Sequence, residues 1–235
     1  MSGDGTPTNA RGGPQRIPRP PGTKRGQPPP WAHLDPGQRR VSIDDVVRAF
    51  ASGRAPRPAL VERFRPRASA VLAALYEDGG EAHVVLTRRS RHLRSHRWEV
   101  AFPGGRQDEG EDAVATALRE ANEEVALPPD KVEVIGELDH LATISSGSFI
   151  VPVVGVLDAP PALTPNPAEV ERVLHVPLSE LLDPQHFREE RWGLGPVDRP
   201  IYFFELVGDT VWGATGAMLV DLLGRITGTD PERGI

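Results

Sequence analysis

Hydrophobic residues follow two different periods along the chain, and these periods separate predicted strands from predicted helices. Apolar residues that alternate with polar ones, or that run on for four to eight positions, are typical of strands. Strands are predicted over residues 68–76, 82–87, 99–102, 132–141, 149–157, 170–176, 201–206 and 210–212. Asp78, Gly79 and Gly80 separate the first two and are typical of a hairpin turn.

Helices are predicted where apolar residues recur every three or four positions. Ser42 is a candidate N-cap for a helix that starts near Val41, with Val46 and Phe50 on its apolar face. Further helices are predicted over residues 111–125, 178–182 and 215–227. Strands and helices do not alternate regularly, which favours an α+β fold over a doubly wound sheet.

The first 40 residues differ in composition from the rest of the chain. They contain nine Pro and seven Gly, and they carry seven Lys and Arg against two Asp. Such a segment buries little apolar surface to offset the entropy of ordering. We therefore predict a disordered, Pro/Gly-rich basic tail over residues 1–40 and a folded domain over residues 41–230. The tail is either a solvated extension or an arm that contacts RNA or another partner.

Charge and cysteine content narrow the function classes. The net charge is −6, so the chain after the basic tail is acidic, which argues against general nucleic-acid binding. The sequence contains no Cys, so disulfides and thiolate chemistry are excluded. No apolar run is long enough to span a bilayer, and the N-terminus lacks the apolar stretch of a signal peptide. We expect a cytoplasmic protein that does not bind membranes.

The predicted helix over residues 111–125 carries an unusual cluster of acidic side chains. Glu120, Glu123 and Glu124 stand at positions i, i+3 and i+4, so their carboxylates gather on one helix face. The opposite, apolar face consists of Val114, Ala117, Leu118, Ala121 and Val125. Like charges this close repel one another, and a hard divalent cation removes the repulsion. Because Mg²⁺ is usually held by one or two carboxylates and by substrate phosphates, the cluster points to a phosphate substrate as well as a metal.

The loop before this helix fits the same chemistry. Gly104 and Gly105 allow the backbone to approach a ligand closely, and the helix N-terminus nearby favours anions. Arg119 can pair with a neighbouring glutamate and hold it in orientation. The set consists of Gly105, Glu111, Arg119, Glu120, Glu123 and Glu124 at fixed spacing. A charged, solvated helix with no function rarely shows all six residue types at these offsets.

This spacing resembles the signature of the Nudix hydrolases, with Ala126 where a Gly usually stands. The resemblance implies an α/β/α sandwich with a mixed β-sheet and divalent-metal-dependent hydrolysis of a nucleoside diphosphate derivative. It implies Glu120 and Glu124 as principal ligands of Mg²⁺ or Mn²⁺. Glu123 would act as a ligand or as the base that activates water, and the Gly104 carbonyl as a further ligand. The expected catalytic residues are therefore Glu123, Glu120, Arg119 and Glu111.

A second, narrower resemblance lies just upstream of this signature. Residues 85–90, Arg94 and residues 102–105 are similar to the additional motif of the coenzyme A diphosphatase branch of the family. It implies coenzyme A or an acyl derivative as substrate, with 3′,5′-ADP and 4′-phosphopantetheine as products. We expect substrate contacts from Arg89, Arg94, Phe102 and Gly105. Trp98 departs from the pattern, because that branch typically carries Gly there.

Three hypotheses follow for this small-molecule nucleotide site. The first is a coenzyme A diphosphatase, and the second is a Nudix hydrolase of another nucleotide, such as ADP-ribose, a dinucleotide or a nucleoside triphosphate. The third is a Nudix-fold binding module without catalysis, against which the complete set of glutamates argues. Glu169 is a candidate base from outside the signature, or an ordinary surface glutamate. The family resemblance also makes a homodimer possible.

Overall fold

A mixed β-sheet and a smaller antiparallel sheet, with helices between and beside them, make up the computed structural model of the chain. It describes residues 11–13, 15–51, 54–59, 67–93, 97–143, 147–194 and 197–229. The helices are α1 (Ile43–Ala51), α2 (Ala113–Val125), α3 (Leu178–Leu182), α4 (Gly213–Thr227) and a short 3₁₀ turn, η1 (Pro129–Lys131). The strands are β1 (Lys24–Arg25), β2 (Arg67–Asp78), β3 (Glu81–Arg89), β4 (Val100–Ala101), β5 (Gly104–Arg106), β6 (Glu133–Glu137), β7 (Leu141–Ala142), β8 (Ser148–Leu157), β9 (Val170–Pro177), β10 (Phe187–Leu194), β11 (Val197–Leu206) and β12 (Asp209–Trp212).

The larger sheet is mixed, as predicted. Its main path runs β4-β3-β2-β8-β6, while β5 pairs with β2, β7 with β8 and β9 with β3. β2 and β8 are parallel and pair over residues 67–76 and 148–157, and the other pairs are antiparallel. The hairpin between β2 and β3 turns at Gly79 and Gly80, which both have positive φ, as the Asp-Gly-Gly sequence predicted.

Alternation along β2 divides the hydrophobic core between the two faces of this sheet. Ala70, Leu72, Ala74 and Tyr76 belong to the cluster that also contains the apolar side chains of α2. Alternate residues of the same strand, such as Leu75, belong to the larger cluster, which includes residues of α1, α3 and α4. Because successive strand residues point to opposite faces, one strand contributes to both cores.

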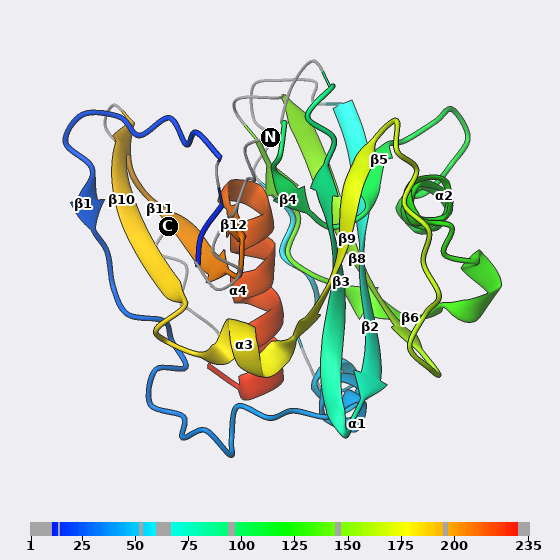
Figure 1. Ribbon diagram of the computed structural model, residues 1–235, viewed down its shortest axis with the longest axis horizontal. Helices are drawn as coiled ribbons and strands as arrows, with labels where there is room; N and C mark the ends of the chain where they lie inside the picture. Colours follow the sequence, from blue (N-terminus) through cyan, green and yellow to red (C-terminus); the bar gives the residue numbers. More distant parts are fainter. Residues whose placement is uncertain are drawn as a thin grey trace, which may run out of the picture.

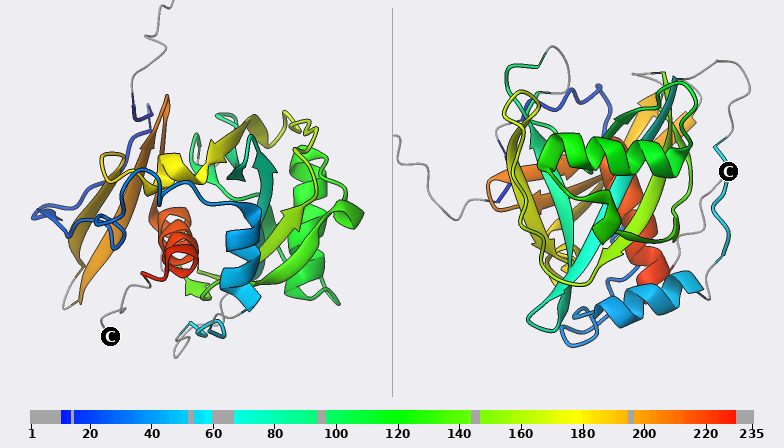
Figure 2. Two further views of the ribbon diagram at one scale, coloured as in Figure 1. Left: turned by 90° about the horizontal axis from the view of Figure 1, so that it is seen from below. Right: turned by 90° about the vertical axis from the view of Figure 1, so that its right-hand side faces the viewer.

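The layers are visible in Figures 1 and 2. The helix α2 covers one face of the larger sheet, and α1 and α4 lie on the other face. The predicted α/β/α sandwich is therefore confirmed. On the far side of α4 stands a second sheet, ordered β1-β10-β11-β12 and antiparallel throughout. This additional layer extends the predicted architecture.

The strand β10 was not predicted, because its sequence is rich in charge. Glu189 and Glu190 are nevertheless almost completely buried. Arg188 and Arg19 both form ion pairs with Glu190, and the indole Nε1 of Trp192 donates to it at 2.8 Å. Buried charges of this kind are tolerated when they are paired and hydrogen-bonded, so a hydropathy pattern alone does not reveal the strand.

The prediction of a disordered tail over residues 1–40 is wrong for its described part, residues 11–13 and 15–40. Trp31 is fully buried between the layers, and its ring lies 5.6 Å from that of Phe187 and 6.3 Å from that of Phe204. β1 pairs with β10 at Lys24 and Arg25. One large aromatic residue anchors the segment despite its Pro/Gly composition, so the folded unit begins well before residue 41.

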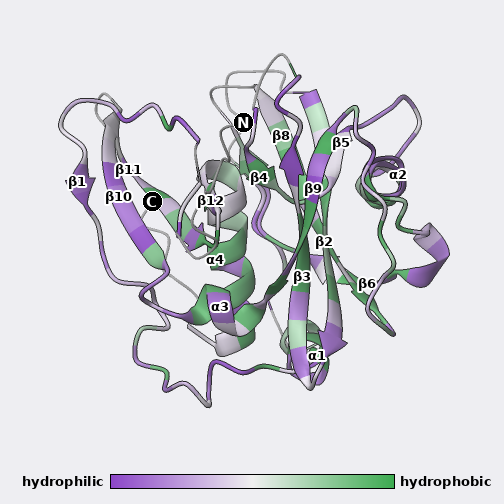
Figure 3. Ribbon diagram, in the orientation of Figure 1, coloured by the Kyte–Doolittle hydropathy of each residue, from purple (hydrophilic) through white to green (hydrophobic). Residues whose placement is uncertain are grey.

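The hydropathy of each helix and strand agrees with its position in the layers. In Figure 3 the helix α4 is mostly hydrophobic, whereas β1 and much of β10 are hydrophilic. This agrees with the position of α4 between two sheets, because a helix covered on opposite sides needs apolar side chains around most of its circumference. No helix within the described residues is long and apolar enough to cross a membrane.

Candidate active site

The helix α2 is fixed at both ends by capping contacts. Asp112 is its N-cap, and a carboxylate oxygen of Asp112 accepts a hydrogen bond from the Ala115 amide at 2.8 Å. Ala126 follows the helix in the left-handed conformation, with φ 56°. Ala117 and Ala121 are buried against the sheet. Glu120 and Glu124 lie against the glycines of the loop that precedes the helix.

Arg119 links the acidic side chains to one another. Its Nε lies 2.7 Å from Oε1 of Glu111, and its Nη1 lies 3.1 Å from Glu120 and 3.0 Å from Glu123. Its Nη2 also donates to the carbonyl of Arg106 at 3.0 Å. Glu111 lies just before the helix rather than within it. The predicted orienting role of Arg119 therefore has a geometric basis in these contacts.

Two glycines let the loop approach the helix. Gly104 and Gly105 lie in β5, where they pair with Val71 and Ala70 of β2. A Cβ atom on Gly105 would lie 2.5 Å from the Glu120 carboxylate, and one on Gly104 would lie 2.4 Å from the carbonyl oxygen of Ala70. A side chain on Gly104 would force the loop away from β2, whereas one on Gly105 would displace the Glu120 carboxylate. The glycines are therefore a steric condition for this site, as the sequence suggested.

The three helical glutamates differ strongly in environment. The side chain of Glu123 is 57% exposed, that of Glu120 15% and that of Glu124 3%. Burial raises the pKa of Glu120, and it raises the pKa of Glu124 to about 7. The nearest compensating groups for Glu124 are Nη1 of Arg89 at 3.5 Å and the amide of Gly104 at 3.4 Å. A buried carboxylate with such long contacts is poorly stabilised in its charged form.

Glu169, which lies outside the signature, faces the same cluster. Its negative charge contributes to the raised pKa of both Glu120 and Glu124. The turn that carries it is fixed at two points, because the Asn166 amide donates to the carbonyl of Glu124 at 2.8 Å and the Ser90 amide donates to the carbonyl of Glu169 at 2.7 Å. The structure thus brings together the signature glutamates and the one outside candidate.

The arginines near residue 90 do not all face the glutamates. Arg89 contacts Glu124, whereas Arg88 turns away and pairs with Asp209 at 3.3 Å. Arg91 and Arg97 are exposed. No ion pair involving either is seen among the described residues. Arg94 lies outside the described residues.

Phe102 lies within the hydrophobic core. Its side chain is only 2% exposed and belongs to the larger hydrophobic core. That Phe102 contacts substrate stays a prediction. Thr116 was missed by sequence reasoning. Its hydroxyl donates to Glu111 at 2.9 Å, and a Thr within a helix gives no separate signal of such a contact.

The donor set suits a hard divalent cation. Glu120 and Glu124 are one turn apart on α2, and both offer carboxylate oxygens beside the glycine backbone, which are the donors that Mg²⁺ and Mn²⁺ prefer. In the described residues no three His, Asp or Glu side chains converge as a ready-made metal site. Arg119 and Arg89 contact the glutamates instead.

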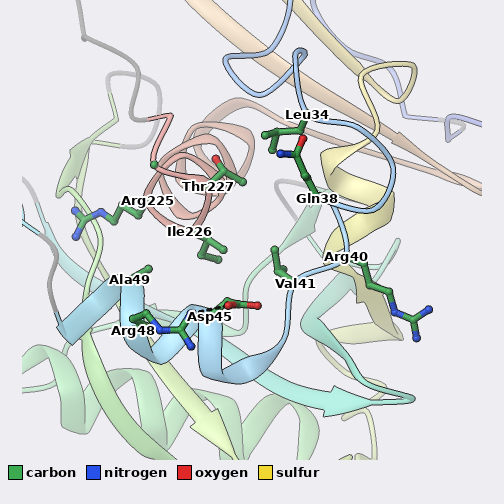
Figure 4. A pocket seen from close by; sticks show the side chains of 11 residues that line it. Leu34, Gln38, Arg40, Val41, Asp45, Arg48, Ala49, Arg225, Ile226 and Thr227 are labelled. Atoms are coloured by element: carbon green, nitrogen blue, oxygen red, sulfur yellow. Dashed lines mark hydrogen bonds and ion pairs between the residues drawn. The ribbon is translucent and has the colours of Figure 1, made fainter.

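A pocket of about 500 Å³ lies elsewhere, between α1 and the C-terminal end of α4 (Figure 4). None of the glutamates of α2 lines it. Its three arginines are already engaged. Arg48 pairs with Asp45 at 2.7 Å, Arg225 pairs with Asp139 at 3.0 Å, and Arg40 donates to the carbonyl of Gly79 at 2.6 Å. We therefore place the chemistry at α2 rather than in this pocket.

A glutamate-bearing helix held against a glycine loop fits a hydrolase that acts on pyrophosphate bonds, a class that generally uses divalent metal ions. The comparisons with known proteins agree. The NUDIX domain model matches residues 66–194, so the chain belongs to the Nudix hydrolase family.

Two curated relatives support this assignment. The chain is 35% identical over 187 residues to an uncharacterised Nudix hydrolase, NudL, of Photorhabdus laumondii, covering 79% of this chain and 98% of that protein. It is 39% identical over 171 residues to the chloroplastic Nudix hydrolase 22 of Arabidopsis thaliana, covering 67% of this chain and 55% of that protein. A solved structure, the Nudix hydrolase RenU of M. smegmatis, is similar with a TM-score of 0.49 and 21% identity, covering 72% of this chain and 91% of that one.

Proposed function

We propose that the protein hydrolyses the diphosphate bond of coenzyme A or acyl-coenzyme A. Water adds to one phosphorus, the bridging P–O bond breaks, and the products are 3′,5′-ADP and 4′-phosphopantetheine or its acyl form. The proposal is carried by the position of the arginines within residues 88–97, which we call the arginine segment. Arg89 lies 3.5 Å from Glu124, and Arg91 and Arg97 are nearby in sequence, exposed and without an ion pair among the described residues.

This arrangement supports a substrate with more than one phosphate group. Coenzyme A carries a diphosphate, which must lie at the glutamates, and a separate 3′-phosphate. Arginine binds phosphate through charge-assisted hydrogen bonds. Arg91 and Arg97 are the groups to which we assign the 3′-phosphate, together with Arg94, which the sequence motif suggests. The motif similarity in residues 85–90 and 102–105 supports the same substrate.

We propose that Glu120, Glu124 and Glu123, with the carbonyl of Gly104, hold the Mg²⁺ or Mn²⁺. When bound, the metal would neutralise charge that develops on the diphosphate oxygens. Arg119 fixes Glu120 and Glu123 in orientation through its 3.1 and 3.0 Å contacts, and Glu111 in turn orients Arg119. Glu123 or Glu169 would accept the proton of the attacking water, a task for which a carboxylate within reach of the substrate is suited.

The experiment is a hydrolysis panel with purified protein and Mg²⁺ or Mn²⁺. The compounds are coenzyme A, acetyl-coenzyme A, dephospho-coenzyme A, ADP-ribose, NADH and nucleoside triphosphates, with Glu124→Gln as the inactive control. We expect coenzyme A to be the best substrate and dephospho-coenzyme A, which lacks the 3′-phosphate, to have a higher KM. A preference for dephospho-coenzyme A would refute the assignment of the arginines.

One observation favours a different nucleotide substrate. Trp98 stands where coenzyme A diphosphatases typically have Gly, and it places an indole beside the arginine segment. Activity confined to ADP-ribose, a dinucleotide or a nucleoside triphosphate would keep the hydrolytic site and overturn the coenzyme A assignment. No turnover of any compound would instead support a binding module. We also propose a homodimer, which light scattering during size-exclusion chromatography tests.

A further inference from the structure

The N-terminal segment reaches the arginine segment through one side chain. Nε2 of Gln15 donates to the carbonyl oxygen of Trp98 at 3.0 Å and to that of Thr210 at 3.2 Å. An amide nitrogen carries two hydrogens, so both are used. Thr210 belongs to β12 of the second sheet, so Gln15 ties the backbone beside the arginines to a regular strand.

Gln15 is itself held by the residues that precede it. The amide of Gly12 donates to the carbonyl of Leu206 at 2.8 Å, and the amide of Gly13 donates to the Thr210 hydroxyl at 3.0 Å. Arg11 forms an ion pair with Glu180 at 2.8 Å. These contacts anchor the segment on the second sheet just before Gln15, so its side chain is presented from a fixed backbone.

The other end of the contact lies at a strained residue. Trp98 has φ 59°, in the left-handed region that side chains other than Gly rarely adopt. The Trp98 amide donates to the carbonyl of Arg89 at 3.2 Å, and the Arg89 amide donates to the carbonyl of Glu99 at 2.9 Å. Arg89 then contacts Glu124. A continuous set of contacts therefore runs from Gln15 through Trp98 and Arg89 to the glutamates.

From these contacts we propose that Gln15 is a positioning residue for substrate binding. By holding the Trp98 carbonyl it keeps the strained turn in place, and the turn fixes the backbone from which Arg89 reaches the site. Gln15 lies outside residues 66–194, the part that the family model matches. The inference rests on the proposed role of the arginine segment in substrate binding, but it does not require that the substrate be coenzyme A.

The test compares Gln15→Ala and Gln15→Glu with the wild type, using the panel compound that the wild type hydrolyses fastest. Loss of hydrogen bonds to the turn is expected to raise KM about fivefold or more, while kcat stays within about twofold. Gln15→Glu should raise KM further, because a carboxylate would face two carbonyl oxygens. Gln38→Ala is the matched control, since the side chain of Gln38 accepts a hydrogen bond from the amide of Asp35, far from the turn.

Hydrogen exchange of the same variants separates failure of this inference from failure of the proposed function. Peptides covering residues 97–102 should exchange faster in Gln15→Ala and Gln15→Glu and at the wild-type rate in Gln38→Ala, whether or not any compound is hydrolysed. Unchanged exchange, or a KM within twofold of wild type in both Gln15 variants, would overturn the inference. If Gln15→Glu does not fold, Gln15→Ala decides alone.

Discussion

Arg119 and Glu111 are eight positions apart in the sequence, yet two nitrogens of Arg119 lie 2.7 and 3.0 Å from the two carboxylate oxygens of Glu111. The contact spans the first two turns of α2 and connects the helix to the residue that precedes its N-cap. The arginine lowers the pKa of Glu111 to about 2, and Glu111 raises the pKa of Arg119. Both groups are therefore charged throughout the neutral pH range.

This pair predicts that Arg119→Lys impairs catalysis more than folding. Lysine keeps the charge but is a single ammonium group, and it loses the planar fork that contacts Glu111, Glu120 and Glu123 together. Residues that orient metal-binding side chains typically contribute about 10–100-fold to activity or metal affinity. We expect a fall in kcat of that size in steady-state assays. Arg48→Lys, at an exposed ion pair with Asp45, should leave kcat unchanged, and wild-type turnover in Arg119→Lys would contradict the orienting role.

The raised pKa of Glu124 predicts a pH dependence of stability. Burial raises this pKa from 4.5 to about 7 in the folded protein, so the folded state binds more protons than the unfolded state between these values. The free energy of unfolding of the metal-free protein should therefore fall as pH rises from about 4.5 to about 7, by on the order of 2–3 kcal/mol. Denaturant unfolding in EDTA across this range measures it.

Glu124→Gln is the control for this dependence. The neutral amide cannot ionise, so the fall in stability above pH 4.5 should become smaller and the metal-free variant should be more stable than wild type at pH 8. Glu111 acts in a different window, because its lowered pKa contributes stability that is lost as pH falls from about 4.5 towards 2. An unchanged profile in Glu124→Gln would show that another group titrates.

The end of α2 predicts a stabilising substitution. Ala126 has φ 56° at the helix C-cap, and its amide donates to the carbonyls of Ala121 and Asn122. An L-residue in this conformation costs roughly 1–2 kcal/mol, which Gly avoids. Ala126→Gly should therefore raise the free energy of unfolding by up to about 1 kcal/mol, after the greater flexibility of Gly in the unfolded chain is included.

The same substitution of Ala by Gly at Ala115 should instead lower the free energy of unfolding. Ala115 is exposed within the same helix, where Gly should cost about 1 kcal/mol. Denaturant unfolding of Ala126→Gly and Ala115→Gly at one pH therefore compares the same chemical change at two positions that differ in backbone conformation. A destabilised Ala126→Gly would mean that the Ala side chain makes favourable contacts that outweigh the backbone strain.

Much of the central domain could be predicted because its elements obey simple periods. The apolar run of β2 predicts a strand, and the helical period of α2 places one apolar face and gathers the glutamates on another. The glycines were predicted to permit a close approach, and the approach is to Glu120. Local spacing suffices where a site is built within one stretch of about 20 residues.

What the sequence did not reveal depends on contacts between distant residues. β10 pairs with β11 along its whole length, and its buried Glu190 is paired with Arg19, 171 positions away. The described part of the segment before residue 41 packs on the domain, because Trp31 contacts Phe187 and Phe204, which lie on β10 and β11, much later in the chain. The overall composition of a segment does not reveal a single buried residue. The Pro/Gly content therefore predicts disorder, although one buried indole anchors the segment to the domain.

Trp98 predicts that two small substitutions differ in stability. Trp98→Gly and Trp98→Ala both lose the indole contacts, but only Gly adopts a φ of 59° without strain. Trp98→Gly should therefore be more stable than Trp98→Ala by about 1 kcal/mol. Thermal or denaturant unfolding measures the difference. Equal stabilities would mean that the turn relaxes to negative φ once the indole is absent.

Trp31 predicts how strongly the N-terminal segment contributes to stability. Trp31→Ala removes a fully buried indole that packs against Phe187 and Phe204 and should cost about 3–5 kcal/mol. Trp31→Phe should cost much less, below about 1.5 kcal/mol. The reason is that the indole Nε1 is buried without a hydrogen-bond partner among the described residues, and phenylalanine removes this unsatisfied donor while keeping an aromatic ring beside Phe187 and Phe204. A cost of less than 1 kcal/mol for Trp31→Ala in denaturant unfolding would instead indicate that the segment packs only weakly on the domain.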